Sequence, residues 1–283
     1  MDLGLTIFAT DQTMAPADLA REAEARGFSS LWVPEHTHIP VSRVTPAPAG
    51  EPMPEEYKRT LDPFVALSMA AAVTTTLRLG TGIALPAQRD PITTAKECAT
   101  LDHLSGGRLS YGIGYGWNID ELEDHGGTKA TRRAVTRERV LAMQSLWADE
   151  VGSFDGEHVH LSPSWAWPKP QQTVKDGRTG VPVFLGGAPG PILFRHIAEY
   201  GDGWLPIGGA GMSAALADLS TALDAVGRRL EDLAVIPFGT LPDRGKLDHY
   251  TSLGVTETVL RLPSAGRDEV LRTLDAYDEF LDR

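Results

Sequence analysis

Residues 94–117 read TAKECATLDHLSGGRLSYGIGYGW, and the interpretation of the whole chain starts from this stretch. Its first half predicts a helix that ends at Gly106 and Gly107, because helices commonly end on a glycine in the left-handed conformation. Residues 108–113 then place apolar side chains at every second position, which indicates a β-strand. The stretch therefore predicts a helix, a tight stop and a strand in direct succession.

Gly112, Gly114 and Gly116 occupy alternate positions at the end of that strand. On a strand this spacing removes the side chains from one face, so a flat ligand could approach the backbone closely. The same glycines are also compatible with a weakened strand end that carries a bulge. They do not complete the dinucleotide-binding fingerprint, because Trp117 stands where the third glycine would be needed.

The composition of the 283-residue chain argues against several classes of protein. Its net charge of -12 argues against a nucleic-acid-binding surface, which needs a clustered basic face. Cys98 is the only cysteine, so the chain can form neither an internal disulfide nor a thiolate metal cluster. The N-terminus has no basic region, and no segment approaches the roughly 18 apolar residues of a membrane span. We therefore expect a cytoplasmic protein without a nucleic-acid or membrane partner.

Strands and helices alternate along the chain, which is the βαβ signature of a parallel sheet. Eight predicted strands are each followed by helical sequence, and no linker or repeat divides the chain. We therefore predict a single (β/α)8 TIM-barrel domain over residues 1–283, with insertion loops after strands 2 and 4; an open, doubly wound sheet is the alternative. The predicted strands cover residues 3–8, 30–33, 77–83, 108–113, 181–185, 203–206, 233–236 and 256–262, and the main helices 16–26, 62–75, 90–105, 131–148, 191–200, 213–230, 243–253 and 267–281.

Two irregular stretches interrupt this pattern, at residues 39–61 and 152–180. Prolines exclude regular structure over most of the first, and a loop this long is either disordered or functional. The active site of a barrel lies on the loops after the strand C-termini, so both stretches are predicted to form the wall of the substrate site. Trp165 and Trp167 in the second stretch favour an apolar or aromatic ligand.

The sequence Glu35-His36-Thr37-His38 follows the second strand, at the predicted catalytic face. One hypothesis is a metal site, since His36 and His38 would point the same way in an extended chain. The ends of strands five to eight offer no further ligand, so no bound metal is expected. A second hypothesis makes His36 a proton carrier or polariser beside a bound ring, with Glu35 accepting a hydrogen bond. The third is a loop histidine without a catalytic role.

Gly186-Gly187-Ala188-Pro189-Gly190 connects the fifth strand to a helix. Backbone N–H groups at a glycine-rich helix N-terminus can bind an anion, and this suits an acidic chain better than a lysine cluster. The alternative is a tight turn that needs glycine only for its backbone conformation.

These segments together resemble the luciferase-like monooxygenase superfamily, and within it the probable coenzyme F420-dependent oxidoreductases. The resemblance extends over residues 3–262, nearly the whole chain, and the block from Leu101 to Gly116 is specific to the superfamily. The matching segments are WVPEH (32–36), LGTGI (79–83), AKE (95–97), TLDHLSGGR (100–108), GIGYGW (112–117), GG (186–187) and DGW (202–204).

The resemblance implies a barrel that holds a tricyclic ring at the strand C-termini and passes hydride between this ring and a small organic substrate. It implies that Glu35 and His36 face the ring and act in catalysis, and that a non-proline cis peptide bond lies between Gly82 and Ile83. It also implies a homodimer. The implied cofactor-binding positions are Glu35, His36, Gly82, Ile83, Gly114, Tyr115, Gly116, and the phosphate loop of Gly186, Gly187 and Ala188.

Two residues depart from the pattern of some deazaflavin dehydrogenases. Trp117 stands where those relatives carry a catalytic glutamate, and Leu85 stands where they carry a threonine. Both departures argue against the sugar-phosphate dehydrogenase reaction and leave cofactor binding in place. We therefore predict a coenzyme F420-dependent oxidoreductase. The alternatives are an FMN-dependent monooxygenase, a metal-dependent barrel hydrolase that uses His36 and His38, and a non-catalytic cofactor-binding barrel.

Overall fold

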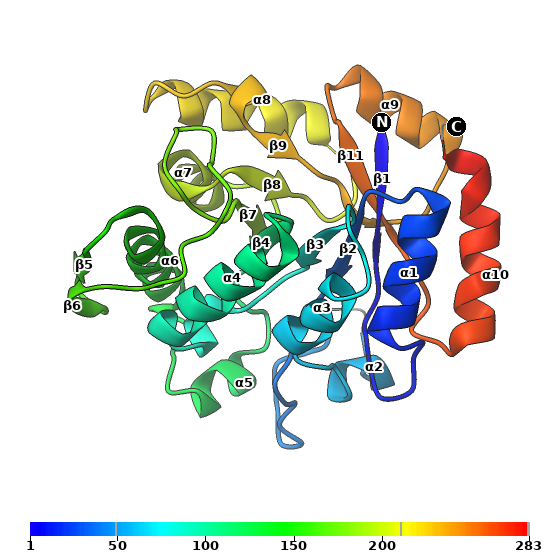
Figure 1. Ribbon diagram of the computed structural model, residues 1–283, viewed down its shortest axis with the longest axis horizontal. Helices are drawn as coiled ribbons and strands as arrows, with labels where there is room; N and C mark the ends of the chain where they lie inside the picture. The colour runs from blue at the N-terminus through cyan, green and yellow to red at the C-terminus, as the bar shows by residue number, and fades with distance from the viewer. Residues whose placement is uncertain (49, 210, 282–283) are drawn as a thin grey trace.

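A computed structural model describes residues 1–48, 50–209 and 211–281, and Figure 1 shows their strands and helices. The strands are β1 (Asp2–Thr6), β2 (Ser30–Val33), β3 (Arg78–Thr81), β4 (Leu109–Ile113), β5 (Gly152–Asp155), β6 (His160–Ser164), β7 (Val183–Gly186), β8 (Gly203–Leu205), β9 (Ala234–Val235), β10 (Phe238–Thr240) and β11 (Glu257–Arg261). The helices are α1 (Pro16–Arg26), α2 (Glu55–Lys58), α3 (Pro63–Ala71), α4 (Pro91–Ser105), α5 (Ile119–Asp124), α6 (Arg132–Ala148), α7 (Pro191–Tyr200), α8 (Met212–Asp224), α9 (Arg244–Ser252) and α10 (Arg267–Tyr277).

Local hydrogen bonds explain where the helices begin and end. The side chains of Asp62 and Asp90 accept hydrogen bonds from backbone N–H groups three residues later, which caps the N-termini of α3 and α4. Helix α4 stops at Gly106, whose φ of 75° is a left-handed conformation that glycine adopts without steric cost. The helix, stop and strand predicted in residues 94–117 are thus confirmed.

Nine strands form one curled parallel sheet in the order β10-β11-β1-β2-β3-β4-β7-β8-β9. Strand β1 pairs along its full length with β11, so the two ends of the chain meet inside the sheet. Neighbours in the sheet follow one another along the chain, which differs from the reversing strand order of a doubly wound sheet. An isolated parallel bridge between Ile207 and Phe238 joins the chain after β8 to β10, near opposite ends of the strand order. The predicted strand 233–236 is observed as two short strands, β9 and β10.

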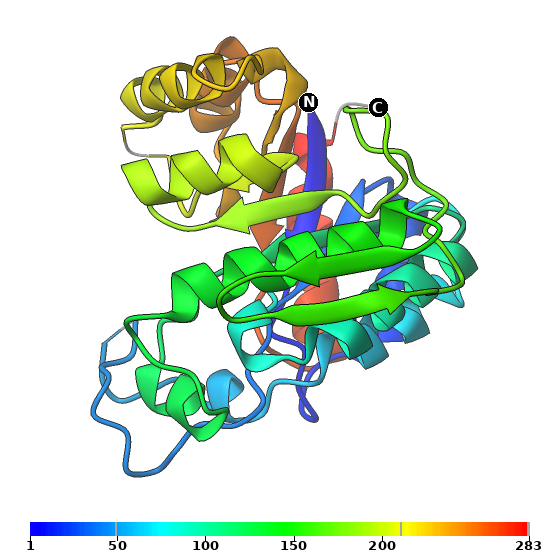
Figure 2. The ribbon, with the colours of Figure 1, turned by 90° about the vertical axis from the view of Figure 1, so that its left-hand side faces the viewer.

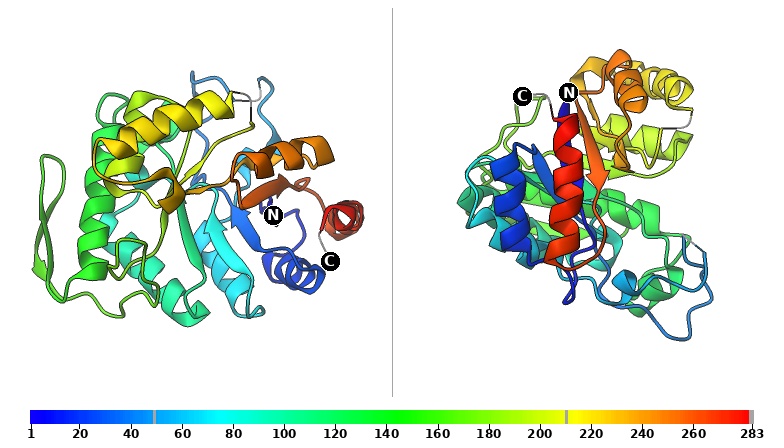
Figure 3. Two further views of the ribbon diagram at one scale, coloured as in Figure 1. Left: turned by 90° about the horizontal axis from the view of Figure 1, so that it is seen from above. Right: turned by 90° about the vertical axis from the view of Figure 1, so that its right-hand side faces the viewer.

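Aromatic rings fill the inside of the curled sheet. Trp32 of β2 packs edge-on against Phe184 of β7 and Phe238 of β10, with ring centroids 5.9 and 5.8 Å apart. A larger apolar core lies between the sheet and the helices. The helices α1, α3, α4, α6, α7 and α8 contact one another in that order, and Figure 3 shows from above that they surround the strands. Within the described residues, no helix has both the length and the apolar character needed to cross a membrane.

Residues 152–180 do not form part of the active-site wall, contrary to the prediction. They contain the antiparallel pair β5 and β6, which lies along the outside of α6 (Figure 2). The carboxylate of Glu138 on α6 accepts hydrogen bonds from the N–H groups of residues 157–159 between these strands. A segment that follows a barrel helix begins at the amino-terminal edge of the sheet, away from the strand C-termini. Trp165 and Trp167 are exposed on this outer layer, so they give no information about the substrate.

Candidate active site

The predicted site residues come together at the carboxyl-terminal edge of four neighbouring strands. Glu35 and His36 follow β2, Gly82 and Ile83 follow β3, Gly114 to Gly116 follow β4, and Gly187 and Ala188 follow β7. Backbone hydrogen bonds connect these segments, because the N–H of Glu35 donates to the carbonyl of Ile83 at 3.2 Å and the N–H of Gly114 donates to the carbonyl of Ala84 at 3.0 Å. This is the edge at which barrel enzymes place their catalytic residues.

The peptide bond between Gly82 and Ile83 is cis, as the resemblance implies. The side chain of Ile83 lies over the neighbouring strand ends. A Cβ added to Gly114 would be 1.9 Å from its Cδ1, and a Cβ added to Gly186 would be 2.9 Å from its Cγ2. Glycine at these two positions is therefore required by Ile83 itself. Gly116 differs, because its φ is 76° and an added Cβ would meet nothing closer than 3.7 Å.

Both carboxylate oxygens of the buried Glu35 are held by protein groups. One accepts from Arg89 Nε at 2.5 Å, and the other accepts from the backbone N–H of Leu85 at 2.7 Å. Burial alone would lower the pKa of Arg89, but the charges of Glu35 and Asp62 outweigh this effect, and the pKa lies above its ordinary value. These contacts join the chain after β2 to the chain after β3 and favour a positioning role for Glu35. Its catalytic role stays a prediction.

His36 is paired with Glu121 of α5, a residue outside the predicted site. His36 Nδ1 lies 2.7 Å from Glu121 Oε2, and both side chains are buried. The indole N–H of Trp117 donates to His36 Nε2 at 3.2 Å. Because an indole N–H can only donate, Nε2 is an acceptor, and the hydrogen of the neutral ring lies on Nδ1 and points to Glu121. The partner of His36 is therefore Glu121, and the expected hydrogen bond between Glu35 and His36 is replaced by this pair.

A helix-start signal could have located Glu121. Asn118 precedes Ile119, Asp120 and Glu121, and an asparagine followed by acidic residues is typical of a helix N-terminus. Helix α5 has only 6 residues, so it is too short to show a hydrophobic period. The contact with His36 depends on how this short helix packs on the chain after β2.

Aromatic rings surround His36. The rings of Tyr57 and Trp117 have centroids 5.4 and 5.6 Å from that of His36, and they contact each other edge-on at 5.9 Å. Phe8 packs on Tyr57 with a centroid distance of 4.7 Å. Tyr57 belongs to α2, within the proline-rich stretch 39–61. The described part of this stretch therefore does line the site.

The proline-rich stretch is fastened to α5. The carboxylate of Asp120 accepts hydrogen bonds from the backbone N–H groups of Val44 and Thr45 at 3.0 and 3.1 Å, and from the Thr45 hydroxyl at 2.6 Å. Helix α5 thus carries two neighbouring acidic residues with different tasks. Asp120 holds the loop, and Glu121 holds His36.

The hydroxyl of Tyr115 is hydrogen-bonded within a cluster of side chains from the loop after β4 and from α7. It lies 2.8 Å from His196 Nδ1 on α7, and the Tyr200 hydroxyl is 3.2 Å from the same nitrogen. Burial raises the pKa of Tyr115 to about 12 and lowers the pKa of His196 to about 4, the latter with a contribution from the charge of Arg195. The cluster joins the loop after β4 to α7. Only the ring face and the backbone of Tyr115 remain available to a cofactor.

The chain after β7 enters α7 through Gly187, Ala188 and Gly190. The indole N–H of Trp204 donates to the carbonyl of Gly187 at 3.1 Å, which holds this loop against the sheet. Helix α7 begins without a side-chain cap, so the N–H groups of its first turn can bind an anion. This geometry is compatible with the phosphate-loop prediction, which stays a prediction.

Two buried amide side chains near Gly116, those of Gln88 and Asn118, have no hydrogen-bond partner in the described part of the chain. Gln88 Nε2 lies 3.7 Å from a Cβ built on Gly116. Buried polar groups nearly always have partners, so a ligand with donor and acceptor atoms next to Gly116 would complete this site. The polar edge of a flavin-like ring carries such atoms, and the residues present therefore fit this class of cofactor.

The two histidines of the 35–38 motif do not converge on one point. His36 contacts Glu121, whereas His38 Nε2 lies 3.0 Å from Asp124 Oδ2. Over residues 1–48, 50–209 and 211–281, no group of three or more His, Cys, Asp or Glu side chains is placed to hold a metal ion. The geometry therefore gives no support to the metal-hydrolase hypothesis.

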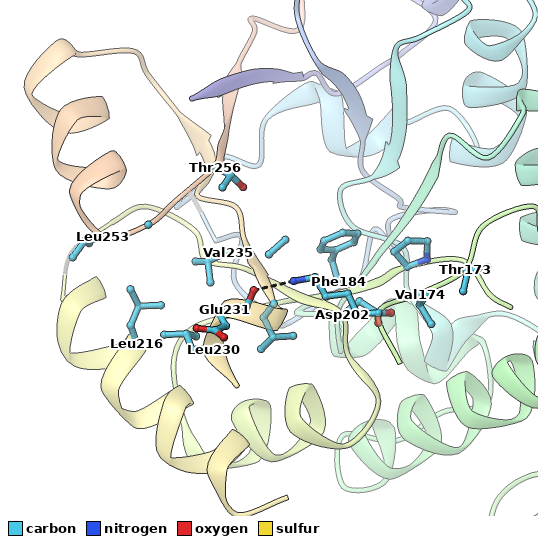
Figure 4. Close-up of a pocket in the computed structure, with 15 residues that line it drawn as sticks. Thr173, Val174, Phe184, Asp202, Leu216, Leu230, Glu231, Val235, Leu253 and Thr256 are labelled. Carbon is cyan, nitrogen blue, oxygen red and sulfur yellow. Dashed lines mark hydrogen bonds between the residues drawn. The ribbon is translucent and has the colours of Figure 1, made fainter. Parts of the chain in front are cut away.

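Two cavities are lined by none of the residues predicted for the site. One of about 740 Å³ is lined by Phe184, Asp202, Val235 and Thr256, among others, at the amino-terminal ends of β7, β8, β9 and β11 (Figure 4). The other, of about 810 Å³, lies between α6, α7 and α8. Because barrel chemistry takes place at the opposite ends of the strands, we assign neither cavity to the reaction.

The chain is similar in sequence and in structure to known proteins. A family model described as luciferase-like monooxygenase matches residues 11–241. An uncharacterized protein of Mycobacterium tuberculosis is 43% identical over 274 residues, which cover 95% of this chain and 94% of that protein. An F420-dependent glucose-6-phosphate dehydrogenase of Kineococcus radiotolerans is 30% identical over 230 residues, which cover 78% of this chain and 62% of the relative. The crystal structure of the monooxygenase RslO1 from Streptomyces bottropensis aligns with a TM-score of 0.78 at 21% identity, covering 99% of this chain and 98% of that one.

Proposed function

The chain belongs to the luciferase-like monooxygenase family, and we propose that it is a coenzyme F420-dependent oxidoreductase that transfers hydride between the cofactor and a small organic substrate. The observation that carries this proposal is the buried pair of His36 and Glu121 at the carboxyl edge of the sheet, beside the cis bond at Gly82–Ile83 and the free space at Gly116. An F420-dependent relative at 30% identity supports the choice of cofactor.

Residues from the strand ends would hold the cofactor. Ile83 and Gly116 would line the ring, the amide of Gln88 would bind its polar edge, and the N–H groups at residues 187–188 and the first turn of α7 would bind the phosphate. A bound deazaflavin supplies a two-electron hydride carrier, which no amino-acid side chain provides. The chain itself provides orientation and the proton-handling group.

His36 would handle the proton that accompanies hydride transfer. With the ring hydrogen on Nδ1, facing Glu121, Nε2 is the basic atom and can accept a proton from a bound substrate. Glu121 orients the ring and stabilises the positive charge that the ring then carries. The aromatic rings of Phe8, Tyr57 and Trp117 line the space beside His36 and favour an apolar or aromatic substrate. The same expectation from the sequence rested on Trp165 and Trp167, which are exposed on the outside of the molecule.

Cofactor titration tests the proposal. Purified protein is titrated with F420 and with FMN, and the fluorescence of each cofactor is followed. We expect F420 to bind more tightly than FMN, and we expect no turnover of glucose 6-phosphate because Trp117 and Leu85 depart from the sugar-phosphate dehydrogenases. Failure to bind either cofactor would refute the proposal.

The description of the family favours a second candidate, a monooxygenase that uses reduced FMN and oxygen. An oxygen electrode separates the two candidates. Oxygen consumption with reduced FMN and a substrate would assign the protein to the second class, because a two-electron deazaflavin does not support it.

We further infer that the sheet closes into a single-domain (β/α)8 barrel. Strands β9 and β10 are separated by Ile236 and Pro237, and these two residues are bonded to opposite neighbours. The N–H of Ile236 donates to Trp204 of β8, and the carbonyl of Pro237 accepts from Val259 of β11. If β9 and β10 are two halves of one strand, the sheet has eight strands. This combined strand then lies between β8 and β11, which closes the barrel. A crystal structure with this strand unpaired on one side would contradict the inference.

We also propose that the protein is a homodimer formed through the outer face of α3 and α4. Val65 and Met69 on α3, and Ile92 and Leu104 on α4, are exposed apolar side chains on two helices that contact each other. Exposed apolar side chains on neighbouring helices are typical of association sites. Sedimentation should give a dimer for the wild type and a monomer for Met69→Glu. A monomeric wild type would refute this proposal.

A further inference from the structure

The cavity of about 740 Å³ at the amino-terminal ends of β7, β8, β9 and β11, which we call the amino-terminal cavity, has mostly apolar walls. The buried side chains of Val174, Phe184, Leu216 and Leu233 line it. Phe184 also packs edge-on against Trp32, so its ring belongs both to the cavity wall and to the core inside the curled sheet. A cavity of this size and character can hold a small organic molecule.

Asp202 brings one carboxylate into this apolar lining (Figure 4). It precedes β8 and belongs to the Asp-Gly-Trp segment at residues 202–204, to which the proposed function assigns no role. Its Oδ2 accepts a hydrogen bond from the backbone N–H of Val183 at 2.8 Å. Within the described residues, no group donates to its Oδ1. One oxygen of the carboxylate is thus used by the fold, and the other can bind a ligand in the cavity.

The cations whose charges act on Asp202 are bonded to other groups. Arg178 is paired with Asp176 at 2.6 Å, and Arg228 donates to backbone carbonyls at the end of α7. Burial raises the pKa of Asp202 above its ordinary value, although the charges of these two arginines and the hydrogen bond from Val183 act in the opposite direction. The carboxylate therefore lacks a partner that would compensate for its burial.

Two further charged residues, Lys175 and Glu231, line the cavity, and both are exposed at its rim. Lys175 Nζ donates to the backbone carbonyl of Glu231 at 2.8 Å, which Figure 4 shows as a dashed line. The ammonium group of Lys175 is therefore held at the rim, away from Asp202. Because exposed charges contribute little to binding in water, the carboxylate of Asp202 is the group that distinguishes between ligands inside the cavity.

We propose that the amino-terminal cavity is a second ligand site, which binds a small amine through an ammonium group that donates to Oδ1 of Asp202. A carboxylate in apolar surroundings favours a cation over a neutral donor, because hydrogen bonds between charged groups are roughly twice as strong as those between neutral ones. The walls around Phe184 and Leu216 favour an apolar body on the same molecule. The inference goes beyond the proposed function, since it involves neither the cofactor nor any residue of the candidate active site.

Calorimetric titration of the full chain with a matched pair of probes tests the proposal. Benzylamine and benzyl alcohol share an aromatic body and differ in the polar group, and near neutral pH only the amine carries a positive charge. We expect the wild type to bind benzylamine roughly tenfold more tightly than benzyl alcohol. Absence of benzylamine binding at millimolar concentrations, or equal affinity for the two probes, would overturn the proposal.

Asp202→Asn tests the role of the carboxylate. The amide oxygen can still accept from the N–H of Val183, while the amide N–H₂ takes the place of Oδ1. Benzylamine then meets a donor, so we expect its affinity to fall roughly tenfold and its advantage over benzyl alcohol to disappear. Glu231→Gln is the matched control, because it removes a carboxylate from the rim of the same cavity, and both affinities should stay within about twofold of the wild type. Wild-type affinity for benzylamine in Asp202→Asn would overturn the proposal.

A second variant and a spectrum of the wild type keep the proposal testable if Asp202→Asn does not fold. Val235→Phe leaves the carboxylate in place and adds bulk to the cavity wall, so it should weaken the binding of both probes; unchanged affinities would overturn the proposal. Methyl NMR of the wild type locates the bound amine. We expect benzylamine to shift the methyl resonances of Val174 and Leu216, whereas shifts confined to Ile83 and its neighbours would place the amine at the candidate active site and overturn the proposal.

Discussion

Replacement of Glu121 by glutamine removes one charge from the site and keeps the size of the side chain. The amide can turn its oxygen toward His36 or toward Thr37. The first orientation sets the amide N–H₂ against the backbone N–H of Thr37, and the second sets it against the Nδ1–H of His36. The second also drives His36 into the tautomer that conflicts with Trp117. Either way one buried polar contact is lost.

The expected magnitude follows from these contacts. A hydrogen bond to a charged group contributes about 1.5–3 kcal/mol, and Glu121 forms one with His36 that strengthens when the ring gains its proton. We expect kcat/KM for the F420-dependent reaction to fall by roughly 10- to 150-fold in Glu121→Gln. Binding of F420 should not change, because the Glu121 side chain has no exposed surface.

The assay is the initial rate of F420 turnover, followed by the change in its fluorescence at several concentrations of an apolar or aromatic substrate. Glu123→Gln is the matched control, since Glu123 lies on the same helix with its side chain exposed. The control should stay within about twofold of the wild type, as surface substitutions usually do. A Glu121→Gln rate equal to that of the control would refute the assignment of Glu121.

Three further predictions concern the scaffold of the site. Arg89→Met should lower the free energy of unfolding in urea by about 3–5 kcal/mol, because it leaves the buried carboxylate of Glu35 without its charge partner; a loss below about 1 kcal/mol would contradict this pairing. The pKa of His196 is held at about 4, below its ordinary 6.5, so the stability that its neutral form provides is complete above pH 6.5 and is lost as the pH falls through about 4. His196→Asn should flatten the stability–pH curve in that window, and an unchanged slope would count against the buried cluster. Gly114→Ala would place its Cβ 1.9 Å from Cδ1 of Ile83, so it should lower Tm and weaken F420 binding in a fluorescence titration; wild-type values for both would show that Ile83 can move without cost.

The limits of the helices and strands were largely predictable because the signals that set them are local. The carboxylate of Asp90 caps an N–H group three residues away, and Gly106 ends the same helix through its own backbone conformation. The short helix α5 and the strands β5 and β6 were missed, since such short elements show little periodicity. The predicted position of residues 152–180 was wrong for a different reason. It assumed that every long irregular stretch lies at the catalytic edge, whereas this one follows a helix.

The place of the candidate site was also predictable, because parallel strands that follow helices in turn must end at one edge of the sheet. The contacts of its residues were not. Glu35 is bonded to Arg89, 54 residues away, and the Tyr115 hydroxyl is bonded to His196, 81 residues away. The glycine at 114 is explained by the side chain of Ile83, which reaches it from the neighbouring strand.

The amino-acid sequence by itself determined the alternation of strands and helices, the family resemblance and the edge at which the site lies. Each of these depends on residue types within a few positions of one another or on their order along the chain. Only the tertiary structure decided which groups contact the two ring nitrogens of His36. They are Glu121, 85 residues from His36, and Trp117, 81 residues away. Folding brings these partners within hydrogen-bonding distance of a buried imidazole, and no local pattern in the sequence specifies which residues they are.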